Sequence, residues 1–157
     1  MEDTDQEKVV GILDSSGFEF EVIKHKKVYT NDEMARELKT STGATVKSIV
    51  LKDQSGDMYH VMIPGNRQLD VINFSKQTRL GRLELLSKQD FYEVTGFRPG
   101  ALPPFGHKTK MKSYISSLLI NRDHVFIISD TLFTSIRIAP RDLASVCNGE
   151  IFHGCLK

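Results

Sequence analysis

Residues 45–63, TVKSIVLKDQSGDMYHVMI, decide the fold class because they have the pattern of two strands joined by a tight turn. Residues 44–51 are apolar on both alternating faces, which is typical of a strand that is covered on both sides and lies inside its sheet. Asp53-Gln-Ser-Gly-Asp57 supplies a hairpin turn, and Met58 to Ile63 form the returning strand. The hairpin predicts a sheet that is largely antiparallel.

Helices and further strands are expected on both sides of this hairpin. Before it, the sequence predicts a helix over 4–16, a strand over 18–22, and a helix from the capping box Thr30-Asn-Asp-Glu33 to about Leu38. After it, the sequence predicts a helix over 69–79, a Ser87-capped helix ending at Gly96, a helical turn near 113–120, strands over 124–129 and 134–139, and a helix from Pro140. Strands arranged in hairpins between single helices indicate an α+β class, with a mixed, largely antiparallel sheet wrapped by helices.

Length and composition are those of one globular unit. The 157 residues are 39% hydrophobic and 26% charged, without internal repeats or a long linker, so residues 1–157 are expected to form a single domain. The net charge of +1 excludes nucleic-acid binding by bulk charge and leaves local patches. The absence of a long apolar run argues against a membrane role. The acidic start, MEDTDQEK, and only two cysteines favour the cytoplasm.

The common catalytic signatures are missing from the sequence. It has no Walker loop, no G-x-S-x-G and no H-E-x-x-H. Cys147, His153 and Cys155 are irregularly spaced, which favours small apolar fillers and a surface histidine over a metal site. No metal ligand set is therefore expected.

Lys47 stands out because period two places it on the same strand face as Ile49 and Leu51. A buried, unpaired ammonium is costly, so this side chain needs a partner or a cleft. Two interpretations stay open: a lysine at the strand end that reaches water, or a fixed cation that waits for an anionic ligand.

Residues 97–109, FRPGALPPFGHKT, hold two of the 11 glycines and three of the five prolines. This composition predicts a rigid, ordered loop. Glycine lets a ligand approach the backbone and proline fixes φ, so the loop is suited to present main-chain N–H and C=O groups. A purely structural Ω-type loop is the alternative.

Two local basic clusters break the otherwise neutral charge pattern. One is Lys24-His25-Lys26-Lys27, and the other runs from His107 to Lys112. Each alone is compatible with a solvated face, whereas two clusters beside one cleft would suit a phosphate backbone.

Four motifs follow one another in a characteristic order. They are His25-x-x-x-x-Thr30, Val46-Lys47-Ser48-Ile49-Val50, Val61-Met-Ile-Pro-Gly65 with Leu69-Asp70, and Thr95-Gly96-Phe97-x-Pro-Gly100-x-x-x-Pro104-Phe105-Gly106. With these motifs the chain resembles, from about His25 to Glu150, the YbaK/prolyl-tRNA-synthetase-associated family of aminoacyl-tRNA deacylases. The resemblance implies a mixed sheet wrapped by helices and the hydrolysis of the ester between a mischarged small amino acid and tRNA, with tRNA(Pro) as the expected carrier.

The resemblance also implies roles for individual residues. Catalysis would rest on the loop backbone and on the substrate's own hydroxyl or side chain, with no metal or cofactor. The expected catalytic residues are Lys47 and Gly100. The expected substrate-binding residues are His25, Thr30, Ser48, Ala101, Leu102, Pro103, Pro104, Phe105 and Gly106. The expected tRNA contacts are Lys26, Lys27, Lys108 and Lys110. The implied partners are the aminoacyl-tRNA acceptor end and, as a candidate, prolyl-tRNA synthetase.

The amino acid that is removed stays open among alanine, cysteine and serine. Members of the family that remove alanine tend to carry Asn where this chain has Ser48. The cysteine-removing branch tends to carry Thr there and an Asp near the position of Ser135, but the Pro104-Phe105-Gly106 ending is similar to that branch. Two further functions are compatible with the same pocket: a catalytically idle module that binds tRNA ends or a synthetase, and a small-molecule binder.

Overall fold

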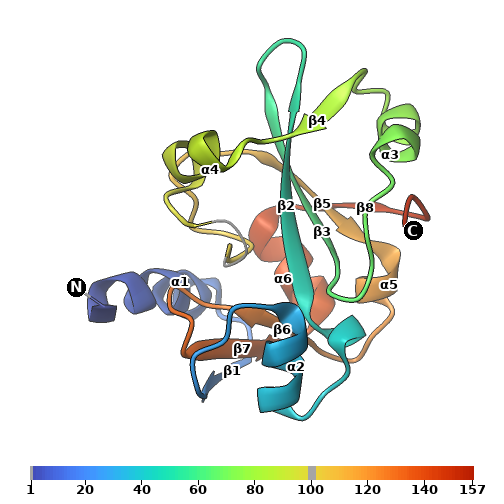
Figure 1. Ribbon diagram of the computed structural model, residues 1–157. Helices are drawn as coiled ribbons and strands as arrows, with labels where there is room; N and C mark the ends of the chain where they lie inside the picture. The colour runs from blue at the N-terminus through green and yellow to red at the C-terminus, as the bar shows by residue number, and fades with distance from the viewer. Residues whose placement is uncertain (1, 99–101) are drawn as a thin grey trace.

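The computed structural model describes residues 2–98 and 102–157, with side chains from residue 8 onward, and shows two β-sheets surrounded by helices (Figure 1). The helices are α1 (Glu2–Ser16), α2 (Asn31–Leu38), a 3-10 turn (Thr42–Ala44), α3 (Val71–Thr78), α4 (Lys88–Thr95), α5 (Ser117–Ile120) and α6 (Pro140–Cys147). The strands are β1 (Phe20–Lys24), β2 (Val46–Asp53), β3 (Met58–Pro64), β4 (Leu83–Leu85), β5 (Lys112–Ser116), β6 (Val125–Ile128), β7 (Thr134–Ile138) and β8 (Glu150–Phe152). The expected α+β class with mixed strand pairing is confirmed.

The larger sheet has the strand order β4-β2-β3-β5-β8. Its first three strands pair antiparallel, whereas β5 pairs parallel with β3, and β8 pairs parallel with β5. The smaller sheet, β1-β7-β6, is antiparallel throughout. A single bridge between Thr45 and Phe126 links the start of β2 to the smaller sheet.

The larger sheet is apolar on both faces, so three clusters form the core. The main cluster lies between the two sheets and contains Val46 and Met62 together with residues of α1, β6, β7 and α6. The second cluster covers the opposite face of the larger sheet around Leu51, Ile63 and Phe74. The third packs Leu102 against Val50 and Phe91, which brings the loop after α4 down onto β2. Burial on both faces explains the continuous apolar run of β2.

Helix ends agree with the residues that mark them in the sequence. Thr30 caps α2 by accepting a hydrogen bond from the Glu33 backbone N–H, and Ser87 caps α4 in the same way through Asp90. Gly96 ends α4 with φ 80, a left-handed conformation that glycine adopts without strain. The predicted Thr30 cap and both ends of α4 are confirmed, whereas the Glu33 carboxylate of the predicted capping box accepts from the Tyr29 backbone N–H rather than from that of Thr30.

Four local predictions are wrong or incomplete. The helical turn predicted near 113–120 is confirmed only at Ser117–Ile120 (α5). Residues 112–116 form strand β5 instead, because their neighbours in the sheet are β3 and β8, which lie far away in the sequence. The first strand begins at Phe20 rather than at residue 18, since its pairing with β7 fixes its register. The short strands β4 and β8 were not expected, and the strands form two sheets rather than one.

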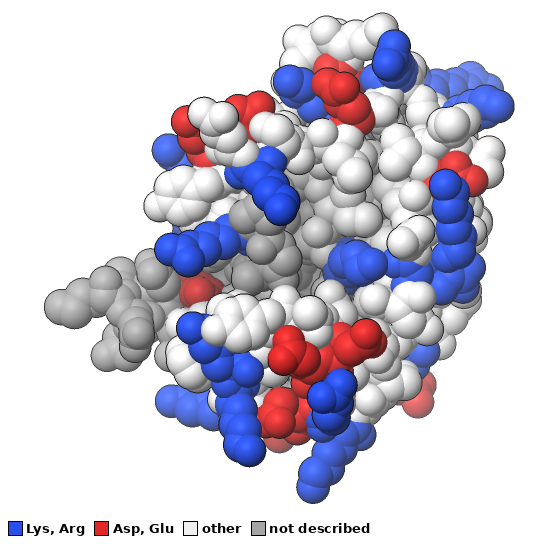
Figure 2. All heavy atoms as spheres, in the orientation of Figure 1, with Lys and Arg blue, Asp and Glu red and all other residues white. Residues whose placement is uncertain are grey.

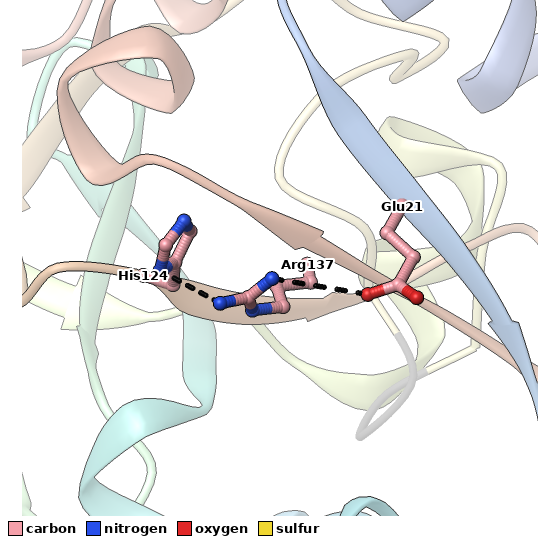
Figure 3. A network of polar contacts seen from close by, with 3 residues as sticks. All are labelled: Glu21, His124 and Arg137. Atoms are coloured by element: carbon pink, nitrogen blue, oxygen red, sulfur yellow. Dashed lines mark hydrogen bonds and ion pairs between the residues drawn. The ribbon is translucent and has the colours of Figure 1, made fainter.

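The smaller sheet carries a short polar network on its surface (Figure 3). Glu21 and Arg137 are direct partners in the β1–β7 register, and the Arg137 Nη1 atom lies 3.9 Å from Glu21 Oε1. Arg137 Nη2 donates to His124 Nδ1 at 3.1 Å. Because both members of the ion pair are exposed, the pair stabilises the fold by about 1 kcal/mol or less. Within residues 2–98 and 102–157, no helix has the length and apolarity needed to cross a membrane.

Candidate active site

A cavity of about 60 Å³ lies beside the open edge of β2. Strand β4 pairs with β2 only at residues 51–53, so the first half of β2 has β3 on one side and the cavity on the other. The described residues that line the cavity come from the 28–31 segment, β2, the loop after α4 and the β6–β7 turn: Val28, Tyr29, Thr30, Asn31, Met34, Val46, Lys47, Ser48, Leu102, Ile128 and Leu132. One water molecule needs about 10–15 Å³ by this measure, so the cavity has room for a few water molecules or a small side chain.

Lys47 lies at the cavity edge, on the strand face that carries Ile49 and Leu51, as expected from period two. Its side chain is half-buried, and its ammonium donates a hydrogen bond to the Arg67 carbonyl oxygen at 2.8 Å. No carboxylate among the described residues forms an ion pair with Lys47. The charge of Lys47 is therefore available to an anionic ligand.

Ser48 lies on the other face of β2 and begins a buried polar chain. Its hydroxyl oxygen is 2.9 Å from His60 Nε2, and His60 Nδ1 is 3.1 Å from the Ser113 hydroxyl oxygen. The His60 side chain is fully buried, and this burial, reinforced by nearby His107, holds the pKa of His60 well below its ordinary value. His60 is therefore a neutral ring at physiological pH.

His107, in the loop after α4, packs against His60. Its ring meets the His60 ring edge to face, with centroids 4.9 Å apart. Its Nε2 atom lies 2.6 Å from the Pro103 carbonyl oxygen, which can only accept, so Nε2 carries the hydrogen. Burial lowers the pKa of His107, and the hydrogen bond to Pro103 opposes this shift.

Thr30 and Asn31 form the wall of the cavity at the start of α2. The Asn31 side-chain amide donates to the Thr45 hydroxyl at 2.9 Å and to the Val46 carbonyl at 3.2 Å, which ties this wall to the start of β2. Gly65 packs directly behind this contact. A Cβ atom at Gly65 would overlap the Thr45 hydroxyl and approach Asn31 to 2.8 Å, so the close packing requires glycine.

His25 does not line the cavity; it lies in the segment that leads to it. Its Nδ1 atom is 2.7 Å from the Lys26 carbonyl oxygen, and its Nε2 atom is 2.7 Å from the Ser135 hydroxyl oxygen. Because a carbonyl oxygen only accepts, Nδ1 carries a hydrogen and the neutral ring accepts from Ser135 through Nε2. His25 thus fastens the 24–30 segment to β7.

The loop residues expected to bind substrate occupy different places. Leu102 lines the cavity, whereas Phe105 packs in the main core and Gly106, with φ 81, lies over Lys8 and Ile12 of α1. The carbonyl groups of Pro103 and Pro104 accept hydrogen bonds from His107 and from the Cys147 thiol. Gly100 and Ala101 lie outside the described residues.

The four lysines expected to contact tRNA, namely Lys26, Lys27, Lys108 and Lys110, are exposed. None of the four forms an ion pair with a described residue. The Lys27 ammonium lies 5.2 Å from the Tyr29 ring centroid and 5.9 Å from that of Phe133, and these rings are 61% and 48% exposed. Figure 2 shows lysine and arginine side chains on several sides of the hollowed centre of one face.

The structure places Thr30, Lys47, Ser48 and Leu102 around one cavity and leaves His25, Pro103, Pro104, Phe105 and Gly106 as its surroundings. Sequence reasoning missed Asn31, His60 and His107. His60 had a usable signal, because it is a polar residue inside a strand that is otherwise apolar. Asn31 had none, since its partners Thr45 and Val46 lie in another segment, and neither did His107, whose contact with His60 joins distant segments.

Cys147, His153 and Cys155 do not form a metal site. The Cys147 thiol donates to the Pro104 carbonyl and the Cys155 thiol donates to the His153 carbonyl. Across the part of the chain that the structure describes, no three His, Cys, Asp or Glu side chains gather as metal ligands. Burial raises the pKa of Cys147 to about 12, so this thiol stays protonated.

The arrangement provides a cation, a hydroxyl and an apolar floor in a space of limited size. The Ser48–His60 contact has the spacing of a nucleophile and its base. However, His60 has a lowered pKa and its second nitrogen faces Ser113 rather than a carboxylate, which makes it a poor base. The chemistry of the cavity is therefore binding, orientation and polarisation of a small polar ligand.

Comparison with known proteins gives this arrangement a class. The profile of the aminoacyl-tRNA editing domain family matches residues 25–146, which is most of the chain and contains every described residue that lines the cavity. The chain belongs to this family. It is therefore a member of a class of hydrolases that cleave the ester of aminoacyl-tRNA.

Individual relatives have related names. The chain is 25% identical over 149 residues to the multifunctional Ser/Thr-tRNA deacylase ProXp-y of Escherichia coli strain K12, covering 92% of this chain and 89% of that protein. It is 24% identical over 119 residues, 76% of this chain and 73% of the relative, to EbsC of Enterococcus faecalis, provisionally named a Cys-tRNA(Pro)/Cys-tRNA(Cys) deacylase. A crystal structure provisionally described as a trans-editing enzyme for prolyl tRNA synthetase matches with a TM-score of 0.86 and 26% identity, over 98% of this chain and 96% of that one.

Proposed function

We propose that this protein is a free-standing trans-editing deacylase that hydrolyses a small amino acid, alanine, cysteine or serine, from mischarged tRNA, with tRNA(Pro) as the preferred carrier. The observation that carries the proposal is the small cavity at the open edge of β2, bordered by the Lys47 side chain, which has no carboxylate partner among the described residues. The names of the curated relatives support the range of amino acids, because they include cysteine and serine.

In the proposed reaction, the aminoacyl group enters the cavity and Lys47 binds the phosphate of the terminal nucleotide. Water adds to the ester carbonyl carbon, the bond from that carbon to the ribose oxygen breaks, and the ribose hydroxyl recovers the proton. Backbone N–H groups around Gly100 to Leu102 would stabilise the negative charge that develops on the carbonyl oxygen. Leu102 lines the cavity, and this contact supports a role for the loop in the reaction.

The exposed lysines extend the proposed site toward the acceptor end of tRNA. Lys27 lies over Tyr29, which lines the cavity, and an exposed aromatic ring beside a cation is suited to stack an unpaired base. A second hollow of about 280 Å³ contains Arg67, whose carbonyl binds Lys47, and Arg122. We propose that phosphates of the acceptor end follow this surface. We also propose that residues 1–157 act as one editing domain. The proposed location of the protein is the cytoplasm. Prolyl-tRNA synthetase is the proposed partner.

The direct test is a panel of tRNA(Pro) samples charged with alanine, cysteine, serine or phenylalanine. We expect ester loss from the small aminoacyl groups and little from phenylalanine, because a pocket that holds a small side chain rejects a larger one by steric overlap. Binding of tRNA without loss of any ester would instead identify a non-catalytic module. Efficient hydrolysis of the phenylalanyl ester would contradict the small-substrate proposal.

A further inference from the structure

The buried chain Ser48–His60–Ser113 is not used by the reaction proposed above, yet it ends in the cavity. It crosses three neighbouring strands of the larger sheet, with Ser48 opposite Met62 in the β2–β3 register and His60 opposite Ser113 in the β3–β5 register. His60 is fully buried, Ser113 is buried, and Ser48 is half-buried at the cavity wall. Only one end of this chain can therefore meet a ligand.

The direction of the hydrogen bonds follows from what each group can satisfy. A neutral histidine has one donor nitrogen and one acceptor nitrogen. If Nδ1 carried the hydrogen, the Ser113 hydroxyl would accept it, and its own hydrogen would be left without another acceptor among the described residues. This is unfavourable, because Ser113 is buried and an unpaired buried donor loses its hydration.

The opposite direction satisfies every buried group. The Ser113 hydroxyl donates to Nδ1, and the Nε2 hydrogen of His60 is donated to the Ser48 oxygen. The Ser48 hydrogen is then directed away from His60, toward the cavity that Ser48 lines. The cavity therefore presents a hydroxyl donor whose direction is fixed from behind.

We propose that His60 is a positioning residue that holds the Ser48 hydroxyl as a hydrogen-bond donor toward the cavity, so that the site selects aminoacyl esters whose side chain ends in a hydroxyl. A serine side chain offers an oxygen acceptor, a cysteine thiol is only a weak acceptor, and the alanine methyl group offers none. The inference rests on the proposed function, because it deepens the substrate class of the same site.

The first experiment compares single-turnover hydrolysis of seryl, cysteinyl and alanyl esters on one tRNA(Pro). The proteins are the wild type, Ser48→Ala, His60→Leu, the double variant, and Ser116→Ala as a matched control. Ser116 is a buried serine on the same strand as Ser113, and its hydroxyl oxygen caps α5 through the Leu118 N–H rather than contacting His60. Circular dichroism and urea denaturation check the fold of each variant.

We expect the wild type to hydrolyse the seryl ester about tenfold faster than the other two, a factor that one well-placed hydrogen bond supplies. Ser48→Ala and His60→Leu should each bring this ratio close to one, the double variant should lose nothing more, and Ser116→Ala should keep the wild-type ratio. A ratio that survives in either single variant would overturn the proposal. Equal loss of all three esters in Ser48→Ala would overturn it too, because that result fits a nucleophile or a ligand of the common ester group.

The second experiment does not depend on activity or on a variant that folds. Long-range ¹⁵N–¹H spectra of the wild-type protein at pH 7 report which nitrogen of His60 carries the hydrogen. A neutral ring protonated at Nε2 is expected, and protonation at Nδ1 would overturn the inference. If the wild type hydrolyses none of the esters, the proposed function is wrong; if it hydrolyses them without a preference for serine, only the role of His60 and Ser48 is wrong.

Discussion

At the scale of single residues, two neutral histidines, the buried His60 and the half-buried His107, connect the site to the stability of the fold. Burial lowers the pKa of both His60 and His107, with a smaller opposing effect on His107 from its hydrogen bond to Pro103. As the pH falls through about 6.5, these histidines are protonated in the unfolded chain but stay neutral in the folded chain. The free energy of unfolding therefore decreases. Each histidine contributes up to about 1.4 kcal/mol per pH unit below that point.

Urea denaturation at pH 7.5, 6.5 and 5.5 measures this dependence. The stability that the neutral rings contribute is complete above pH 6.5 and is lost below it, and the loss should be shallower in His60→Leu because one of the two rings is absent. A wild-type protein that is equally stable at pH 7.5 and 5.5 would contradict the assignment of both rings as neutral.

Individual side chains were predictable from the sequence only where a local pattern fixes them. Period two placed Lys47 on the face of Ile49 and Leu51, and the Ser-x-x-Asp pattern identified the Ser87 cap. The partner of Lys47 was not predictable, because the Arg67 carbonyl is 20 residues away and its position depends on the turn after β3. The partners of His60 were not predictable for the same reason, since Ser48 and Ser113 reach it only through strand pairing.

At the scale of elements, the two basic segments are expected to supply most of the tRNA affinity. The segments are residues 24–27, which lead into the cavity wall, and residues 107–112, which follow the loop. Lysines that contact phosphates release counterions, and each contact adds about 0.7–0.9 to the slope of log affinity against log salt. Replacing Lys26, Lys27, Lys108 and Lys110 with Gln should weaken binding and reduce this slope by up to about 3.

Fluorescence titration of tRNA at several salt concentrations measures the slope. The matched control replaces Lys39, Lys52, Lys76 and Lys88, which removes the same charge from other parts of the chain. The preference among aminoacyl groups should not change in either variant. Equal effects of the two replacements would show that only net charge matters and that the basic segments form a solvated face.

Elements with local signals were predicted well, and elements that depend on distant pairing were not. The β2–β3 hairpin, α2 and α4 carry their turns and caps in the sequence next to them. The helical turn predicted near 113–120 exists only as α5, and strand β5 was missed because its parallel partners, β3 and β8, contribute nothing to the local pattern. The three-residue strands β4 and β8 are too short to show a period.

At the scale of the whole molecule, the cavity exists because the two sheets meet at one corner. The Thr45–Phe126 bridge and the main core hold the start of β2 against the smaller sheet, so that Ile128 of β6 and Leu132 of the β6–β7 turn line the same cavity as Val46 and Ser48. The two pairs of residues are 80 to 86 positions apart in the sequence. Their proximity follows from tertiary packing, so the motifs could predict several residues that line the cavity but not its shape.

The central claim is that the protein binds and hydrolyses an aminoacyl ester in this cavity, with Lys47 as the main charged contact. A hydrogen-bonded contact from an ammonium to a phosphate is worth more than a neutral one, so its loss should slow hydrolysis by about 10- to 100-fold. Lys47→Ala removes the charge without leaving another charge unpaired, so the free energy of unfolding should be unchanged or slightly higher.

Single-turnover hydrolysis of the best mischarged tRNA by the wild type, Lys47→Ala and Lys52→Ala tests this claim most directly. Lys52 is the matched control, because it lies on the same strand five residues away and does not line the cavity. Circular dichroism confirms the fold of each protein. We predict a large loss of rate for Lys47→Ala and a wild-type rate for Lys52→Ala, whereas hydrolysis by Lys47→Ala at the wild-type rate would contradict the assignment of the site.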